Sequence, residues 1–152
     1  MKAMILAAGH GTRLGDLTKS RPKALVYFNG KPMLEQLLLR LKGQGFQHIL
    51  INVHHFAEQI ITFVESHNSF GLNIQFSDER EQLLDTGGAI LFAQNFFRGE
   101  EPVLIHNVDV CSDLDFRQLK QQFTATKALA GLIVRKRETS RYLLFDKQQK
   151  LT

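Results

Sequence analysis

Residues 2–14 have the sequence KAMILAAGHGTRL, an apolar run that passes directly into a loop with glycines at positions 9 and 11. A nearly continuous apolar run is typical of a parallel strand that is covered on both faces. The small residues that follow let the backbone approach a ligand closely, and successive N–H groups in such a turn form a concavity that binds anions. The stretch therefore predicts a buried strand over 2–8, followed by a phosphate-binding loop.

The charge of this loop supports a phosphate ligand. Residues 10–23 have a net charge of +3, from Arg13, Lys19, Arg21 and Lys23 against Asp16. A tight strand-to-helix turn with incidental surface bases is the alternative interpretation. The glycines coincide with Arg13 and with a Pro-Lys pair at 22–23, which favours a loop that holds more than one phosphate.

Two familiar phosphate motifs do not fit. A nucleoside triphosphatase loop requires Gly, four residues and then Gly-Lys-Ser/Thr, but Gly9 is followed by Leu14-Gly15-Asp16, so that no Gly-Lys pair stands there. A dinucleotide-binding fingerprint requires glycine at position 14, where the chain has Leu14. A nicotinamide-dependent enzyme is therefore a poor interpretation.

The rest of the chain alternates strand-like and helix-like apolar patterns. We expect strands over 2–8, 48–53, 72–76 and 102–107, and helices over 32–42, 56–67, 86–97 and 114–124. This order predicts parallel βαβ units in a three-layer α/β/α, Rossmann-like fold with a mainly parallel sheet, in which ligands bind at the carboxyl ends of the strands. We expect two more strands, over 130–135 and 142–145, to form a hairpin.

Length and composition describe one globular domain. The chain has 152 residues, of which 43% are hydrophobic and 22% charged, without a repeat, linker or low-complexity stretch. We expect a single domain over 1–152, and because the chain stops where the hairpin should continue, we expect it to be the amino-terminal part of a longer domain. No apolar run approaches the ~18 residues of a membrane span, and no cleavage signal follows the first strand. One cysteine, Cys111, cannot form an internal disulfide, so a cytoplasmic location fits best.

Charge is unevenly distributed along the chain. Residues 117–152 hold nine basic and two acidic residues, whereas the net charge of 1–116 is −3. A basic tail can bind nucleic acid, but no aromatic-interleaved surface for bases accompanies it. We therefore expect a hairpin with solvated charges, and neither nucleic acid nor membrane as a partner.

The six histidines do not predict a metal site. His54 and His55 are adjacent and point to different sides of an extended chain, and the others are scattered, so no ligand spacing emerges. His54 follows the second strand and is a candidate contact to a sugar. His10 lies between the loop glycines and faces either phosphate or water.

Several motifs along the chain resemble those of one enzyme family. The segment from Ala8 to Arg13, with Arg21-Pro22-Lys23, resembles the signature G-x-G-T/S-R…P-K of the sugar-1-phosphate nucleotidyltransferases. Further matches follow in the family's order: Gly30-Lys31-Pro32-Met33, Leu84-Asp85-Thr86-Gly87-Gly88 and Asn107-Val108-Asp109. Within the family, residues 51–54 and 84–88 most resemble the N-acetylmuramate-1-phosphate uridylyltransferase branch, and mannose-1-phosphate guanylyltransferases share much of the pattern.

The resemblance implies transfer of a nucleotidyl group, with UTP favoured, from a nucleoside triphosphate to a sugar-1-phosphate. It implies Arg13 and Lys23 as catalytic residues, Lys23 and Asn107 as contacts to the sugar phosphate, and Asp109 as a ligand to Mg²⁺. The nucleotide would be held by ten residues, namely Ala7, Ala8, Gly9, Gly11, Thr12, Arg13, Glu79, Thr86, Gly87 and Gly88. The nucleotide and the sugar phosphate are then the expected partners, and the oligomeric state stays open.

Several positions depart from the family's pattern. Glu79 is the candidate contact to the base, but the segment 78–83 is one residue longer than in the relatives, so Glu81 is an alternative. Val108 replaces the usual glycine, so that either its backbone is ordinary or the pocket is reshaped. The family's second metal carboxylate would lie beyond the end of this chain, while Asp113 and Asp115 are better interpreted as the start of a helix.

These departures keep alternatives to the uridylyltransferase hypothesis open. The same family includes guanylyl-, thymidylyl- and cytidylyltransferases. A catalytically silent module that binds nucleotide or sugar phosphate is the remaining alternative.

Overall fold

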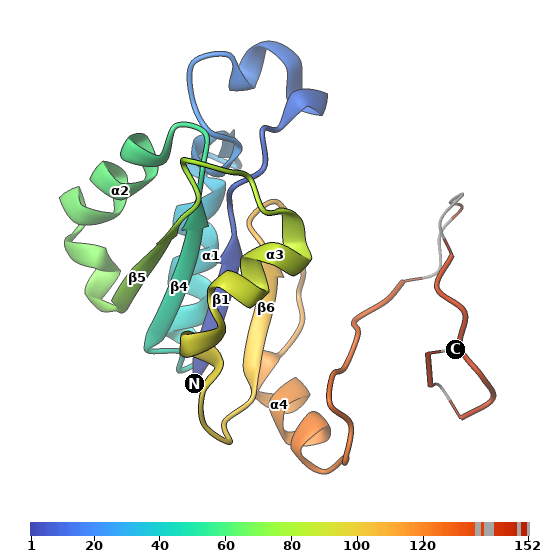
Figure 1. The fold of residues 1–152 in the computed structure, drawn as a ribbon. Coiled ribbons are helices and arrows are strands. Elements are labelled where there is room, and N and C mark those ends of the chain that lie inside the picture. The colour runs from blue at the N-terminus through green and yellow to red at the C-terminus, as the bar shows by residue number, and fades with distance from the viewer. Residues whose placement is uncertain (136–137, 139–141, 149, 152) are drawn as a thin grey trace.

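The computed structural model describes residues 1–135, 138, 142–148 and 150–151. Its centre is a parallel sheet of order β5-β4-β1-β6 (Figure 1). The four strands are β1 (Lys2–Leu6), β4 (His48–Val53), β5 (Asn73–Asp78) and β6 (Val103–Asn107). The predicted parallel sheet is confirmed, and the predicted bounds of β4 are those of the structure.

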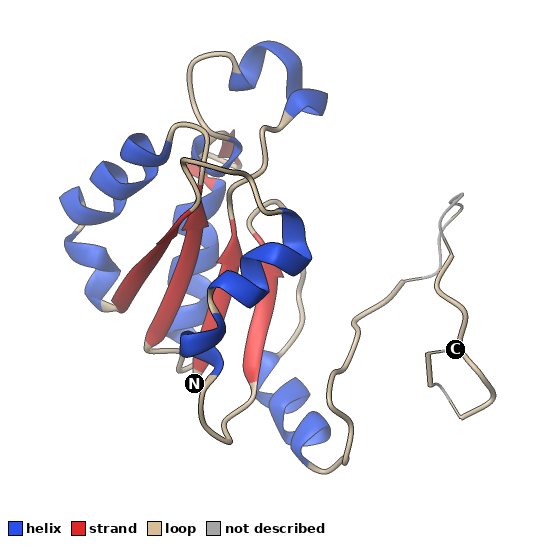
Figure 2. Cartoon of the chain, in the orientation of Figure 1, coloured by secondary structure: helices blue, strands red, loops and turns tan. Residues whose placement is uncertain are grey.

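Helices cover both faces of this sheet, as Figure 2 shows. Along β1, Ala3 and Ile5 face the larger core, which also takes buried side chains from α1 (Met33–Gly43), α2 (Ala57–Ser66) and α4 (Phe116–Thr124). Met4 faces the opposite side, where Ala89 of α3 (Asp85–Phe92) packs against it. Successive residues of a strand point to opposite faces, so one short strand serves two helical layers. The predicted three-layer fold is confirmed.

The helices form where apolar residues recur at helical spacing. In α1 the buried positions are Leu34, Leu37, Leu38 and Leu41, which form one stripe toward the sheet. The helix predicted over 86–97 is divided, because α3 ends at Phe92 and a 3-10 turn, η4 (Gln94–Phe97), follows. Such tightening is common at helix ends.

Short elements that the sequence did not predict lie mainly around the first loop. A two-residue antiparallel pair joins β2 (Tyr27–Phe28) to β3 (Lys31–Pro32). Three more 3-10 helices are η1 (Thr12–Thr18), η2 (Lys23–Leu25) and η3 (Asn68–Gly71). Two of them, η1 and η2, fold the glycine-rich segment back over the end of the sheet (Figure 1).

The start of α4 confirms the interpretation of its acidic residues. Asp115 precedes the helix, and its Oδ1 accepts hydrogen bonds from the backbone N–H groups of Arg117 and Gln118, at 2.9 and 3.0 Å. These are donors that an α-helix leaves without a partner at its first turn. Asp115 is therefore the cap of this helix.

The expected carboxyl-terminal hairpin is wrong. Residues 130–135 form no strand, and of 142–145 only Phe145 forms a bridge, with Leu151; residues 136–137 and 139–141 lie outside the described part. Leu132, Ile133 and Val134 are each more than half exposed, and Figure 1 shows this segment leading away from the sheet. A strand requires hydrogen bonds from a neighbouring strand. Apolar patterning alone did not supply that neighbour.

Within the described residues, no helix combines the length and the apolar character that crossing a membrane requires.

Candidate active site

The carboxyl ends of the four parallel strands meet at one edge of the sheet. The register places Leu6 of β1 beside Asn52 of β4 and Asn107 of β6, and Asn52 beside Ser77 of β5. The loops that leave these strand ends carry the residues predicted for the site. The structure thus gathers segments that are far apart in the sequence, at the edge where ligands bind in open α/β sheets.

The glycine-rich loop is held closed by Gly11 and Thr18. Gly11 has a φ of 68°, and a Cβ at this position would lie 3.0 Å from Cγ2 of Thr18 and 3.1 Å from Cβ of Lys23. The buried hydroxyl of Thr18 donates to the carbonyl oxygens of Gly11 and Gly15, at 3.2 and 3.1 Å. Glycine is therefore strongly favoured at position 11, because the backbone is left-handed and the loop folds closely onto Thr18 and Lys23.

Two other predicted glycines have no such structural cause. Gly9 and Gly87 lack a left-handed φ, and a Cβ added to either would meet nothing within 4 Å. Gly88 differs, because its Cβ would lie 2.9 Å from Cβ of Leu84. The fold itself would accept a side chain at Gly9 and Gly87, so packing within the described residues does not explain glycine at either position. Thr86, at the start of α3, is exposed beside Gly87.

The ammonium group of Lys23 forms an ion pair with the carboxylate of Asp109. Lys23 begins η2, whereas Asp109 follows β6, and the two side chains are 20% and 35% exposed. The structure therefore joins the predicted phosphate-binding lysine to the predicted metal ligand and leaves both accessible. Arg13, in η1, and Asn107, at the end of β6, are exposed as well.

Asn52 is a residue of this edge to which sequence reasoning gave no role. Its Oδ1 accepts from the backbone N–H groups of Ala7 and Ala8, at 2.6 and 3.3 Å, and its Nδ2 donates to Oε1 of Glu79 at 2.9 Å. Only 4% of Asn52 is exposed. A signal was present, because Asn52 interrupts the apolar run of β4, and a buried polar group must find partners.

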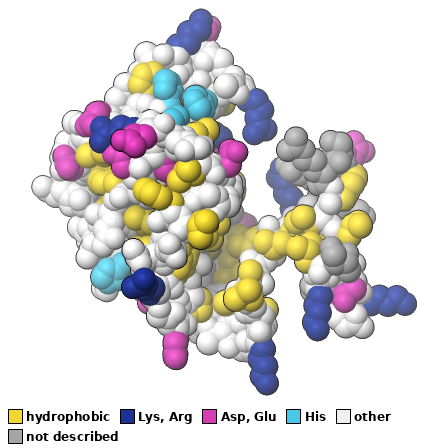
Figure 3. Space-filling model, viewed as in Figure 1, with side chains coloured by type: hydrophobic (Ala, Val, Ile, Leu, Met, Phe, Trp, Pro, Cys, Tyr) yellow, Lys and Arg dark blue, Asp and Glu magenta, His cyan; other side chains and the backbone are white. Residues whose placement is uncertain are grey.

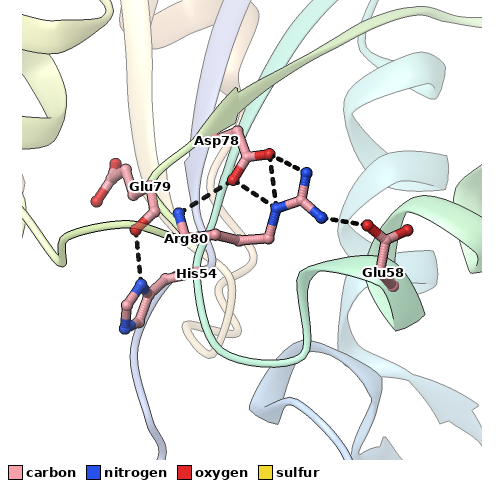
Figure 4. A network of polar contacts seen from close by, with 5 residues as sticks. All are labelled: His54, Glu58, Asp78, Glu79 and Arg80. Carbon is pink, nitrogen blue, oxygen red and sulfur yellow. Dashed lines mark hydrogen bonds and ion pairs between the residues drawn. The ribbon is translucent and has the colours of Figure 1, made fainter.

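Glu79 is buried rather than open to the site. It is 2% exposed, and its Oε2 accepts from the backbone N–H of Leu84 at 3.3 Å. Its own carbonyl oxygen accepts from Nδ1 of His54 at 2.7 Å (Figure 4). Glu81, the alternative contact to the base, lies exposed on the same turn. The contact of either residue to a base stays a prediction, and Glu79 visibly holds the turn 79–84 together.

An arginine clamps the outside of that turn to α2. The guanidinium of Arg80 donates from Nε to both carboxylate oxygens of Asp78, at 2.8 and 3.0 Å, and contacts the carboxylate of Glu58 in α2 (Figure 4). The hydrogen bond from Arg80 lowers the pKa of Asp78 below its ordinary value. All three groups face solvent, so the clamp orients the turn and adds little to overall stability.

Three histidines converge here, which the sequence did not indicate. The ring of His10 lies 5.3 Å from that of His54 and 5.4 Å from that of His55, between centroids. Figure 3 shows imidazole side chains gathered at this end of the molecule. In the part of the chain that the structure describes, no group of three or more His, Cys, Asp or Glu side chains is arranged to hold a metal ion.

The valine that replaces the family's glycine is accommodated in the core. Val108 is 4% exposed, its φ is not positive, and its backbone N–H donates to the carbonyl of Leu6 at 3.1 Å. Of the two alternatives for this position, the structure shows an ordinary backbone. The side chain packs with Phe116 and other members of the larger core.

Comparisons with known proteins agree with this geometry. The sequence profile of the nucleotidyl transferase family matches residues 2–149. An N-acetylmuramate alpha-1-phosphate uridylyltransferase of Caulobacter vibrioides is 43% identical over 70% of this chain and 45% of its own length. A mannose-1-phosphate guanyltransferase of Yarrowia lipolytica is 34% identical over 93% of this chain and 40% of its own.

Solved structures show the same similarity. The crystal structure of HddC from Yersinia pseudotuberculosis, complexed with GMP-PN, superposes with a TM-score of 0.70 at 32% identity, over 80% of this chain and 53% of that one. The chain thus spans about half the length of the relatives it matches.

Proposed function

This chain belongs to the nucleotidyl transferase family, and on that premise we propose that it transfers a nucleotidyl group from a nucleoside triphosphate to a sugar-1-phosphate and releases pyrophosphate. The observation that carries the proposal is the ion pair of Lys23 with Asp109, beside a loop whose Gly9 leaves space for a ligand. A cation for phosphate and a carboxylate for a metal ion are the two groups that phosphoryl chemistry requires side by side.

The reaction needs alignment more than it needs proton transfer. An oxygen of the sugar phosphate attacks the α-phosphorus, a new P–O bond forms, and the bond from the α-phosphorus to the bridging oxygen of pyrophosphate breaks. Because the attacking oxygen is already an anion near neutral pH, no general base is required. The rate then depends on how the chain positions the two substrates and neutralises their charge.

The proposed roles of the charged residues follow from their positions. Lys23, partly buried against the loop, supplies a compact positive charge to the α-phosphate and the incoming phosphate. Arg13, exposed in η1, binds the β- and γ-phosphates with its planar fork and stabilises pyrophosphate as it leaves. Backbone N–H groups of the loop from Gly9 to Thr12 complete this cradle for anions.

Asp109 fits the requirements of a Mg²⁺ ligand. It is a partly exposed carboxylate at a strand end, beside the phosphate loop, and Mg²⁺ is commonly bound by one or two carboxylates together with substrate phosphates and water. Bound there, the ion would polarise phosphate oxygens and neutralise their charge. Asp109 would hold the ion, while Lys23, released from Asp109, would turn toward phosphate.

The nucleoside is assigned to the other half of the edge. Ala7, Ala8 and Gly9 follow β1, and residues 86–88 lie in the first turn of α3, whose preceding residue Leu84 is hydrogen-bonded to Glu79. UTP is the proposed donor because residues 51–54 and 84–88 resemble the uridylyltransferase branch and because relatives named as uridylyltransferases are 43% and 42% identical. Asn107, exposed at the end of β6, is the proposed contact to the sugar phosphate.

Pyrophosphate release tests the proposal. The protein is incubated with Mg²⁺ and each of the four nucleoside triphosphates, and with dTTP, against a panel of sugar-1-phosphates. Release that requires one sugar phosphate together with UTP is the expected result, and release with another nucleotide would reassign the donor within the family. Saturable nucleotide binding without release would instead identify a silent binding module and overturn the proposed activity.

A further inference from the structure

We propose that Asn52 is a positioning residue that couples the turn 79–84 to the phosphate-binding loop, so that both halves of the nucleotide site are set by one buried side chain. The inference rests on the proposed function, and it concerns how the site is built rather than which reaction it performs. Asn52 contacts no substrate in this account. It acts through Ala7 and Ala8 on one side and through Glu79 on the other.

The end of β1 is held by the side chain of Asn52. The ladder between β1 and β4 ends at the pair Leu6 and Asn52, so the N–H groups of Ala7 and Ala8 lie beyond the last paired residue of β1. Both alanines are at least nine-tenths buried, and buried N–H groups require acceptors. The side-chain oxygen of Asn52 accepts from both and so fixes the direction in which the chain enters Gly9.

Glu79 lies on the other side of the Asn52 amide. Two N–H donors face one end of the Asn52 amide, so that end must be the oxygen, and the amide nitrogen must face Glu79. Oε1 of Glu79 accepts from this nitrogen, while Oε2 accepts from the N–H of Leu84, just before α3. Two side chains therefore link the start of α3 to the start of the phosphate loop.

The chemistry explains why asparagine stands here. The position demands an acceptor toward β1 and a donor toward a carboxylate, and an amide offers both on one short side chain. Aspartate would keep the acceptor but would set a second carboxylate against Glu79. A leucine would leave three buried polar groups without a partner.

A reciprocal exchange of the two side chains tests the coupling. When Asn52→Asp is combined with Glu79→Gln, the new carboxylate at position 52 accepts from both alanines and from the new amide at position 79. The oxygen of that amide accepts from the N–H of Leu84, so every hydrogen bond is kept and only the central one has its polarity reversed. Each single substitution breaks at least one of them. Ser77→Ala is the matched control, because Ser77 is buried beside Asn52 in the register and its Oγ has no hydrogen-bond partner among the described residues.

Affinity for two probes, UTP and inorganic tripolyphosphate, is measured in these four variants and the parent, each shown to be folded by circular dichroism. Tripolyphosphate has no base, so a purely local defect of the turn 79–84 would not change its binding. We expect Glu79→Gln and Asn52→Asp to lower the affinity for both probes, and Asn52→Asp to lower it by about tenfold or more. We expect the double variant to return to within about threefold of the parent, and Ser77→Ala to bind as the parent does.

Two results would overturn the inference alone: a folded Asn52→Asp variant that binds both probes as the parent does, or a folded double variant that binds no better than the weaker single variant. A parent protein that binds none of the nucleoside triphosphates would remove the proposed function as well, which separates the two failures.

Discussion

Lys23 and Asp109 form an ion pair at the candidate site, where Lys23 comes from the segment after β1 and Asp109 from the segment after β6. The pair neutralises two groups that would otherwise attract phosphate and a metal ion. In the proposed reaction each member would meet a better partner, because a divalent cation would compete for the carboxylate and phosphate would compete for the ammonium. The ion pair would then link metal binding to the release of Lys23.

Asp109→Ala is expected to lower the rate of Mg²⁺-dependent pyrophosphate release by about a hundredfold or more. The substitution removes the carboxylate that follows β6 and faces Lys23. The side chain is partly exposed and makes its ion pair in contact with solvent, so the fold should persist. Pyrophosphate release at increasing Mg²⁺ concentration checks the loss of activity, and a circular dichroism spectrum checks that the fold persists. Unchanged turnover would remove Asp109 from the site.

Lys23→Met is expected to tighten the binding of a divalent cation while it slows turnover. Removing the ammonium frees the carboxylate of Asp109 and removes a positive charge from its neighbourhood, so Mn²⁺ affinity without nucleotide should rise about threefold to tenfold. Electron paramagnetic resonance of free Mn²⁺ measures this directly. Lys19→Met is the matched control, because Lys19 pairs with Asp16, at 2.6 Å, in the same loop but away from Asp109. Equal Mn²⁺ affinity in both variants would show that the ion pair does not restrain the metal ligand.

Local sequence patterns predicted the order of strands and helices in this fold. The strand predicted over 48–53 is formed as β4, because a mostly apolar run is typical of a parallel strand that is covered on both faces and here pairs with β1 and β5. The ordered motifs placed Lys23 and Asp109 in one site, and the ion pair agrees with that.

What could not be predicted depends on contacts between distant segments. Asn52 gains its role only because Glu79 and the end of β1 flank it in the sheet. His10 meets His54 because the strands that they follow, β1 and β4, are neighbours in the sheet. The segment 130–135 shows the converse case, since its strand-like apolar pattern met no pairing strand in the described residues. Local periodicity reports which face is apolar, but not what lies against it.

Gly11→Ala and Gly9→Ala should separate stability from binding. At Gly11 a side chain would be forced into a left-handed backbone and against Thr18 and Lys23, so the free energy of unfolding should fall by about 1–2 kcal/mol or more. At Gly9 the backbone is ordinary and the space is open, so the unfolding transition should not move, while UTP affinity should fall about tenfold because the added methyl occupies ligand space.

Urea unfolding and UTP titration of the two variants provide the check. If Gly9→Ala binds UTP as tightly as the parent, the open space beside Gly9 does not receive the nucleotide.

His106 should make the stability of the fold depend on pH. The residue is 8% exposed in β6, its Nδ1 donates to the carbonyl of Asn107 at 2.7 Å, and its ring packs edge-on against Phe116. Burial, the largest effect, lowers the pKa of this imidazole below its ordinary value of 6.5. The hydrogen bond to the Asn107 carbonyl opposes this shift, the positive charge of Arg40 adds to it, and Asp109 opposes it weakly. At pH values between the lowered pKa and 6.5, the imidazole is therefore protonated in the unfolded chain and neutral in the folded chain.

The sign follows from that difference in protons. The unfolded state takes up more protons in this window, so the free energy of unfolding rises with pH there; the contribution is complete above pH 6.5 and is lost as the pH falls toward the lowered pKa. His106→Asn keeps a donor for the Asn107 carbonyl but cannot titrate, so its urea midpoint should vary less between about pH 5 and 7 than that of the parent. The exposed His67→Asn variant is the control and should retain the parent's pH dependence. If the urea midpoint of His106→Asn changes with pH as that of the parent does, another group governs the stability at acid pH.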